Sequence, residues 1–321
     1  MNGKILAFGE IMMRLSPTGT DSLRSGKSFA VTYGGTEANV LACLTAFGHE
    51  TEYLTALPEG ELGCAVLDHL AKSGVGTSFV KTGGDTLGIY FAENDLSGSR
   101  GAKVIYYRRH SEFTRLHPGS FDTDKIFDGV SLFHISGISF ALSASSRELA
   151  FELMKEAKKR NIKISFDFNY RPSLWNAEEA KPHLAAAASL ADIILASRRD
   201  LTTFLDTDER RAADEYPFDI LVLRDRKILS ENRHSVKVSM IKRGGSSCDI
   251  PERAFSVTER IGGGDAFDGA LLHSLMTGAA DEEALLFAVT AFALKHTIAG
   301  DTFTLKEKDV YGYENVPEVI S

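Results

Sequence analysis

The chain has 321 residues, of which 43% are hydrophobic and 25% charged, and its formal net charge is −8 at pH 7. It is long enough for one large α/β domain with an appendage or for two domains, and its composition is typical of an ordinary globular protein. The acidic balance and the lack of a long basic run argue against nucleic acid and anionic membrane as partners, while a local basic pocket for an anionic substrate stays open.

Targeting and cysteine patterns point to the cytoplasm. The first residues are typical of a strand rather than a signal peptide, and no apolar run approaches membrane-spanning length, so we expect a cytoplasmic protein. Cys43, Cys64 and Cys248 are widely separated and form neither a disulfide framework nor a metal set. We expect free, mostly buried thiols.

The N-terminal part begins with short apolar runs. Residues 5–8 predict a buried strand of a parallel sheet, and residues 11–14 continue as a second strand before a polar loop over 16–28. Gly34 and Gly35 then precede a helix that runs to Phe47. These glycines let a ligand approach the backbone, and Asn39, about one turn inside the helix, offers a donor and an acceptor. A loop with a satisfied Asn would give the same pattern.

Residues 86–108 alternate in the manner of a β-hairpin. Its strands cover 88–92 and 103–108, with a turn at 97–99, and the strand near 11–15 is expected to join them. From about residue 120 the pattern changes to alternating strands and helices, which predicts a parallel sheet covered on both faces. The expected strands cover 131–135, 162–168, 192–196 and 220–223. A helix from Ser143 or Ser145 to Arg160 is expected after the first strand. A second helix over 177–190, which Pro182 kinks or divides, is expected after the strand over 162–168.

Polar residues follow the strand over 162–168, at the end where open α/β sheets bind ligands. Arg171, held extended by Pro172, is expected to share one pocket with Tyr106 and Arg108 of the hairpin. Two guanidinium groups suit a carboxylate through bidentate bonds, so this set indicates an acidic ligand. The alternative is a local salt bridge between Asp167 and Arg171.

Three consecutive glycines, Gly262, Gly263 and Gly264, lie before a run with helical apolar spacing. Glycines cost backbone entropy and contribute no packing, so they suit a tight turn whose amides face one point at a helix N-terminus. Such a turn binds phosphate or a developing oxyanion. Asp265 follows directly, where an acid would handle a proton or a metal. This predicts phosphoryl transfer without a Walker lysine, and an ordinary loop with Asp265 as a helix cap is the alternative.

The segments 34–76 and 262–269 resemble the two signatures of the ribokinase (PfkB) family of carbohydrate kinases. The resemblance implies one kinase domain over 1–321 with a ribokinase-like three-layer αβα core, a mostly parallel sheet, and lid strands from about 10–33 and 86–112. It also implies ATP and Mg²⁺, allows a monovalent cation, and implies a homodimer or higher homo-oligomer that pairs through the lid. The Asp that the family places upstream of the glycines, with a role in cation binding, is Glu259 here.

The same resemblance implies roles for individual residues. Asp265 would be the catalytic base, and the amides of Gly262, Gly263 and Gly264 the anion hole. The expected sugar contacts are Gly34, Gly35, Asn39, Tyr90, Tyr106, Arg108, Arg171 and Asp301, with a simple helix cap as the alternative role of Asp301. Asn169, Ser197 and Arg224 are the expected nucleotide contacts, with Lys242 to Gly245 as an alternative to Arg224. No metal ligand is assigned directly.

Within the family, residues 8–17, 106–108, 167–175 and 293–301 resemble the branch that acts on 2-keto-3-deoxygluconate. This implies transfer of the γ-phosphoryl group of ATP to the terminal 6-hydroxyl of that sugar acid. A fructokinase or another sugar kinase of the family is an alternative. A sugar-acid-binding relative without catalysis is another, and the altered segment Ser197-Arg198-Arg199-Asp200 motivates it.

Overall fold

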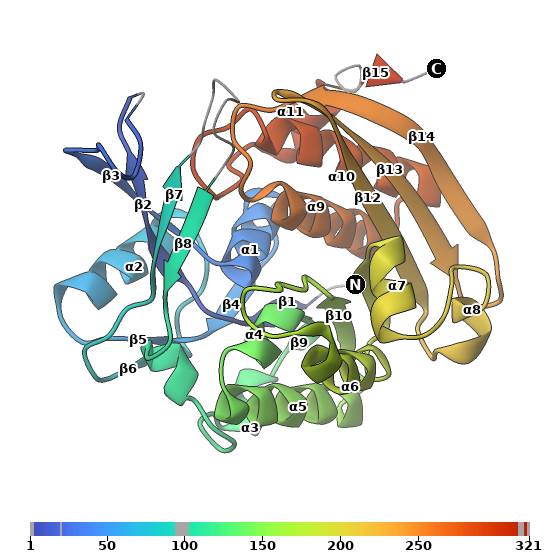
Figure 1. Ribbon diagram of the computed structural model, residues 1–321. Coiled ribbons are helices and arrows are strands. Elements are labelled where there is room, and N and C mark those ends of the chain that lie inside the picture. The colour runs from blue at the N-terminus through green and yellow to red at the C-terminus, as the bar shows by residue number, and fades with distance from the viewer. Residues whose placement is uncertain (1–2, 20, 94–102, 314–317, 320–321) are drawn as a thin grey trace.

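A nine-stranded sheet forms the centre of the molecule (Figure 1), in the order β15-β14-β13-β12-β11-β10-β9-β1-β4. The computed structural model describes residues 3–19, 21–93, 103–313 and 318–319. The strands of this sheet are β1 (Lys4–Phe8), β4 (Thr51–Leu54), β9 (Val130–Ser136), β10 (Lys163–Asp167), β11 (Ile193–Ala196), β12 (Ile220–Ser230), β13 (Arg233–Lys242), β14 (Ser247–Ser256) and β15 (Glu318–Val319). From β4 to β12 all neighbours are parallel.

Helices cover both faces of the sheet, because its parallel strands are apolar on both sides. Along β1, Leu6 and Phe8 join one core while Ile5 and Ala7 join another on the opposite face. The first core contacts η1 (Glu112–Arg115), α3 (Thr123–Ile126), α4 (Gly137–Ala141), α5 (Ala144–Lys159), α6 (Ala177–Ala188), α7 (Arg198–Phe204) and α8 (Ala212–Glu215). The other face packs against α1 (Thr36–Ala46), α2 (Glu61–Lys72), α9 (Gly263–Thr277), α10 (Asp281–Lys295) and α11 (Glu307–Tyr311). The expected three-layer αβα core is confirmed.

A second, four-stranded sheet has the order β3-β2-β7-β8 and stands beside the main sheet (Figure 1). Its strands are β2 (Met12–Pro17), β3 (Phe29–Gly34), β7 (Ile89–Glu93) and β8 (Lys103–Tyr107). We call it the lid sheet. The hairpin of β7 and β8 and its pairing with β2 are as predicted, whereas the turn predicted at 97–99 lies outside the described residues. Two short parallel strands, β5 (Ala56–Leu57) and β6 (Lys81–Thr82), form a third sheet.

The segment after residue 223 differs from the prediction. The strand predicted over 220–223 continues to Ser230, so Arg224 lies inside β12, opposite Val238 of β13, and not after the strand. The strands β12, β13 and β14 then form an antiparallel meander that the sequence analysis did not predict. Pro182 lies within the single helix α6. The helix after residue 143 has Ser143 as its N-cap, in a capping box with Ser146.

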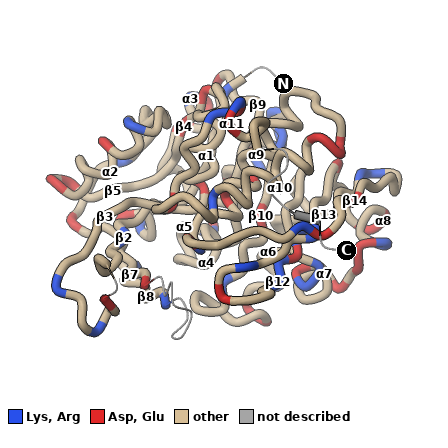
Figure 2. The backbone as a smooth tube through the Cα atoms, turned by 90° about the horizontal axis from the view of Figure 1, so that it is seen from above, with Lys and Arg blue, Asp and Glu red and all other residues tan. Residues whose placement is uncertain are grey.

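Basic and acidic residues are interspersed along the chain (Figure 2). Among the described residues, no helix is both long and apolar enough to cross a bilayer. The thiols are free, but the prediction that most are buried is wrong, since Cys64 is exposed and Cys248 half-buried.

Candidate active site

A cavity of about 700 Å³ opens between the carboxyl ends of the parallel strands and the lid sheet. Every site residue expected from the sequence lines this one cavity. These residues are Gly34, Gly35, Asn39, Tyr90, Tyr106, Arg108, Asn169, Arg171, Ser197, Arg224, Gly262, Gly263, Gly264, Asp265 and Asp301. Three elements distant in sequence therefore converge here: the turn before α1, the end of β10 and the turn before α9.

The glycine turn begins α9. Gly262 is its N-cap, in a left-handed conformation with φ of 83°, and a Cβ at this position would lie 2.0 Å from the carbonyl oxygen of Asp301. A Cβ at Gly263 would similarly meet the ring of His296 at 2.0 Å. Only glycine fits both constraints. The first N–H groups of a helix have no intrahelical partner, so this turn presents its amides and the positive end of the helix dipole to the cavity.

Asp265 lies in the first turn of α9, and both of its carboxylate oxygens accept hydrogen bonds from α1. The Thr36 hydroxyl donates to Oδ1 at 2.5 Å, and the Asn39 amide donates to Oδ2 at 2.6 Å. The Asn169 amide in turn donates to the Thr36 hydroxyl at 3.0 Å. Burial raises the pKa of Asp265 above its ordinary value, although the bonds from Thr36 and Asn39 oppose this. The carboxylate is thus fixed in place and more basic than an exposed Asp.

On the lid side, Asp301 is buried and takes part in a chain of charged and polar contacts. Its carboxylate pairs with the Arg14 guanidinium at 2.6 Å and accepts a hydrogen bond from the Tyr90 hydroxyl. Arg14 also pairs with Glu259 at 3.1 Å. Because the partners of Asp301 come from β2 and β7, its carboxylate joins the lid sheet to the region of the glycine turn rather than capping a helix.

The two arginines expected to bind a carboxylate have different surroundings. Arg108 is buried, donates from Nε to Glu10 at 2.6 Å, and lies 5.6 Å from the centre of the Tyr106 ring. Arg171 is exposed, and no Asp or Glu among the described residues lies within 4.0 Å of its guanidinium. The alternative salt bridge between Arg171 and Asp167 is therefore not formed. Of these two arginines, Arg171 is the one that lines the cavity without an acidic partner among the described residues.

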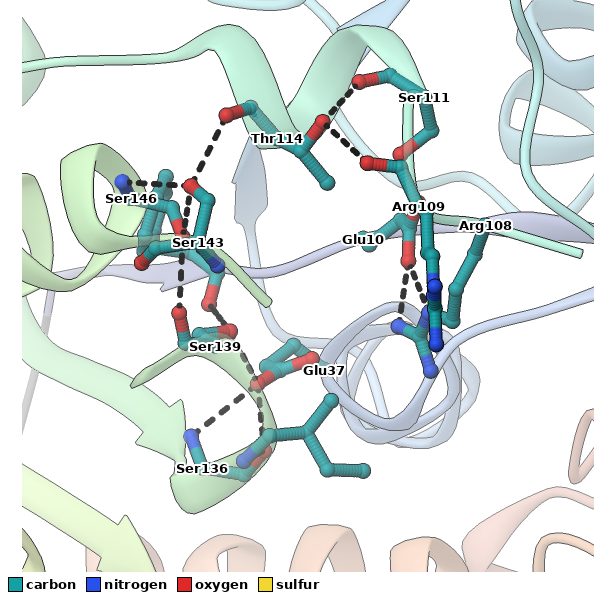
Figure 3. Close-up of polar contacts among 12 residues, drawn as sticks. Glu10, Glu37, Arg108, Arg109, Ser111, Thr114, Ser136, Ser139, Ser143 and Ser146 are labelled. Atoms are coloured by element: carbon teal, nitrogen blue, oxygen red, sulfur yellow. Dashed lines mark hydrogen bonds and ion pairs between the residues drawn. The ribbon is translucent and has the colours of Figure 1, made fainter. Parts of the chain in front are cut away.

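Glu37 also lines the cavity, and Figure 3 shows its carboxyl group beside Ser136 and Ser139. It is 1% exposed, and its Oε1 accepts hydrogen bonds from the Ser136 amide at 3.1 Å, the Ser136 hydroxyl at 2.7 Å and the Ser139 hydroxyl at 3.0 Å. Burial raises the pKa of Glu37 to about 7. Figure 3 shows these serines together with the Glu10–Arg108 pair on the neighbouring strand end.

Comparison with known proteins accounts for this arrangement. The sequence matches the pfkB family carbohydrate kinases over residues 2–308. The chain belongs to this family. The 2-dehydro-3-deoxygalactonokinase of Haloferax volcanii is 29% identical, over 97% of this chain and 96% of that protein. A 5-dehydro-2-deoxygluconokinase of Clostridium tetani is 25% identical, over 90% and 86%. The crystal structure of a 2-dehydro-3-deoxygluconokinase from Thermotoga maritima superposes with a TM-score of 0.91 at 33% identity, covering 97% and 99% of the chains.

In this PfkB kinase, Arg224 lies beneath the glycine turn. Its Nη1 donates to the Gly264 carbonyl at 3.0 Å and to Asp268 Oδ1 at 2.8 Å. Burial raises the pKa of Asp268 well above its ordinary value, and Arg224 opposes this. The alternative counterpart, residues 242–245, connects β13 to β14 away from the cavity, where Lys242 pairs with Asp281 at 2.6 Å.

The segment 197–200, which departs from the family pattern, forms the N-terminus of α7 in the kinase. Ser197 is the N-cap of α7, and the Asp200 carboxylate accepts from the Ser197 hydroxyl at 2.7 Å and from its amide at 2.8 Å. Burial raises the pKa of Asp200, and the nearby Asp167 carboxylate adds to this. Two carboxylates thus lie close together in the cavity.

Sequence analysis missed several residues of the kinase's cavity and its supports. Thr36 lies between Gly35 and Asn39, and this position within the glycine motif could have indicated a residue of the site. Glu10 and Arg14 were quoted only for their resemblance, although a lone arginine in the apolar strand β2 is itself a signal of a buried partner. Asp268 and Lys295 gave no separate signal, since both lie within regular helical patterns.

Proposed function

We propose that the protein transfers the γ-phosphoryl group of ATP to the terminal hydroxyl of 2-keto-3-deoxygluconate or a closely similar keto-deoxy sugar acid. The observation that carries this proposal is the Asp265 carboxylate, held by Thr36 and Asn39 at the N-terminus of α9. The three relatives described above are all named as kinases of sugar acids. Their names support an acidic substrate for this chain as well.

The reaction needs a base for the sugar hydroxyl and an anion hole that stabilises the charge on the transferring phosphoryl group. Asp265 accepts the proton of the sugar hydroxyl, and the resulting oxygen attacks the γ-phosphorus. The bond from the γ-phosphorus to its bridging oxygen breaks, so that ADP leaves with that electron pair. The amides at Gly263 and Gly264 stabilise the charge on the transferring group. Phosphoryl transfer depends mainly on positioning, so the contacts that fix Asp265 contribute directly.

The residues of the cavity fit magnesium and nucleotide in chemical type. Mg²⁺ is usually bound through one or two carboxylates, waters and substrate phosphates, and Asp167 and Asp200 provide two such carboxylates in the same cavity. When bound with ATP, the ion would neutralise charge on the phosphates. Several arginines line the cavity and favour a polyanion there. They are Arg108, Arg171, Arg199, Arg224, Arg226 and Arg260.

Arg171 is the residue that we assign to the substrate carboxylate, because it alone of the two expected arginines has no acidic partner among the described residues. Arg108 instead forms its pair with Glu10 and lies against Tyr106, so it would position the lid over the sugar. Asn39, expected to contact sugar hydroxyls, is engaged with Asp265.

We also propose that the chain works as one kinase domain and that the lid sheet pairs two copies. Val31, Val104 and Tyr107 on the lid sheet are 51%, 38% and 65% exposed. A four-stranded sheet with apolar groups in solvent gains stability when a second copy covers it. Tyr90, on β7 of the same sheet, is buried within its own chain and is not part of this exposed surface.

A coupled ADP-release assay tests the activity. The substrates to compare are 2-keto-3-deoxygluconate, its galactonate epimer, 5-keto-2-deoxygluconate and fructose. We expect the highest kcat/KM for a 2-keto-3-deoxy sugar acid. Fructose as the best substrate would contradict the acidic assignment, and no ADP release with any sugar would favour a relative that binds without catalysis.

A further inference from the structure

Lys295, the last residue of α10, has a fully buried side chain behind the glycine turn. Its Nζ donates to the carbonyl oxygens of Ile298 at 3.0 Å and Gly300 at 2.7 Å. A Cβ at Gly262 would lie only 2.9 Å from Lys295 Cε. The ammonium group therefore sits between the segment that leads to Asp301 and the turn that forms the anion hole.

The surroundings of Lys295 are acidic. The carboxylates of Glu259, Asp301 and Asp265 favour its charged form, while burial lowers the pKa of Lys295. Glu259 and Asp301 are bridged by Arg14, at 3.1 Å and 2.6 Å. Two cationic groups of the chain thus lie in the space around Glu259, which stands where the family resemblance suggests a role in cation binding.

A buried ammonium that donates to backbone carbonyls performs the same electrostatic work as a monovalent cation coordinated by them. Carbonyl oxygens are the usual ligands of potassium, and an ammonium group satisfies the same lone pairs through N–H bonds. Here the carbonyl oxygens of Ile298 and Gly300 accept hydrogen bonds from Lys295. The carboxylates of Asp301 and Glu259 accept hydrogen bonds from Arg14. The residues around Glu259 therefore do not fit a free monovalent cation.

We propose that the Lys295 ammonium is a built-in replacement for a monovalent cation, which braces the segment 298–301 against the glycine turn and makes the protein independent of potassium. Lys295 is then a positioning residue, since it acts on the anion hole through backbone atoms. A test by turnover rests on the proposed function, whereas a test by melting temperature needs no substrate.

The first measurement compares the melting temperature of the substrate-free protein in potassium chloride and in choline chloride at equal ionic strength. We expect the same value in both salts, because the carbonyl and carboxylate oxygens around Glu259 already have Lys295 and Arg14 as cationic partners. Turnover in the two salts is expected to agree within about twofold, since a ligand that does not bind the native state shifts nothing. Clear stabilisation or activation of the parent protein by potassium would overturn the proposal.

Variants of Lys295 give the second measurement. Lys295→Ala removes the charge and opens space, so its turnover should fall by about 10²-fold, as expected when catalytic groups shift by about 1 Å. Potassium or ammonium should restore part of its turnover and raise its melting temperature, whereas Lys295→Met, which fills the space without charge, should lose turnover and gain nothing from either ion. Lys163→Ala is the matched control. Lys163 begins β10, at the end of the strand away from the cavity, and forms its ion pair with Asp219 there.

The outcomes separate the proposals. Parental turnover in Lys295→Met, or a Lys295→Ala protein that folds and ignores both ions, would overturn the role of Lys295. If Lys295→Ala fails to fold, the salt comparison on the parent and the turnover of Lys295→Met decide the question. If no sugar acid is phosphorylated, the melting comparison still tests the built-in cation while the substrate assignment fails separately.

Discussion

The side-chain amide of Asn39 donates a hydrogen bond of 2.6 Å to the carboxylate of Asp265, which lies 226 residues further along the chain. Together with the Thr36 hydroxyl, this bond makes the start of α1 the support for the reactive group at the start of α9. The two glycine turns therefore form one unit, and the first turn positions the base as well as lining the sugar site.

Thr36→Val tests this support. Valine keeps the shape of threonine but removes the donor to Asp265, so the pKa of Asp265 should rise further above its ordinary value. A hydrogen bond to a charged group contributes about 1.5–3 kcal/mol, which corresponds to a rise of about one pKa unit or more. We expect the acid limb of the kcat/KM profile to move to higher pH by that amount. Thr45→Val is the control, since Thr45 is also on α1 but bonds Thr51 of β4 and not Asp265. An unmoved acid limb in Thr36→Val would argue against Asp265 as the titrating group.

Arg171→Leu tests recognition of the acid. Loss of the guanidinium should raise KM for the keto-acid about tenfold or more, at about 1.4 kcal/mol per decade, and change KM for a neutral sugar of similar size much less. Lysine should restore only part, because it lacks the planar fork. Equal losses for acidic and neutral sugars would remove Arg171 from this role.

Arg108→Leu should behave differently. It leaves the buried Glu10 carboxylate without its cation, and breaking a buried pair in this way costs about 3–5 kcal/mol. We therefore expect a clear fall in the free energy of unfolding and similar kinetic losses for acidic and neutral sugars. Wild-type stability together with a loss specific to the keto-acid would instead place the substrate carboxylate on Arg108.

The buried Glu37 carboxyl predicts a pH dependence of stability. Its pKa is about 7 in the folded protein, against about 4.3 in an unfolded chain, so the folded state binds the extra proton between these values. Stability should then fall as pH rises from about 4.3 to 7, and this group alone contributes roughly 3–4 kcal/mol to that fall. Glu37→Gln retains an Oε1 for the Ser136 and Ser139 donors, so its unfolding free energy relative to the parent should increase with pH. A difference that is constant between pH 5 and 8 would show that Glu37 is ionised throughout.

The lid sheet predicts a dimer. Tyr107 is 65% exposed on β8, so Tyr107→Glu should place a charge in the proposed interface and favour the monomer. Light scattering at micromolar protein measures this, with the exposed Tyr313, outside the lid sheet, changed to Glu as the control. A parent protein that is already monomeric would contradict the proposed pairing.

The parallel half of the sheet could be predicted because each of its strands is a short apolar run next to a polar segment. The meander could not, since in β13 the polar residues Arg233, Ser235 and Lys237 interrupt the apolar ones and Pro251 lies inside β14. Antiparallel pairing tolerates this pattern, because one face of such strands can meet water.

The site was predictable where its residues lie in the glycine motifs and not where contacts join distant segments. Arg14 meets Glu259 across 245 residues and Asp301 across 287. No spacing rule links such positions, so the ionic network behind the glycine turn emerges only from the fold. The pairing of Arg108 with Glu10, 98 residues away, was hidden for the same reason.

Turnover of Asp265→Asn tests the central claim most directly. The amide cannot accept the hydroxyl proton, yet it preserves the size of the side chain beside Thr36 and Asn39. We predict that kcat for the sugar acid falls by about 10²–10⁴-fold while its dissociation constant, measured by calorimetry, stays within a few-fold of the parent. A variant that keeps more than roughly a tenth of parental turnover would contradict the assignment of Asp265 as the base.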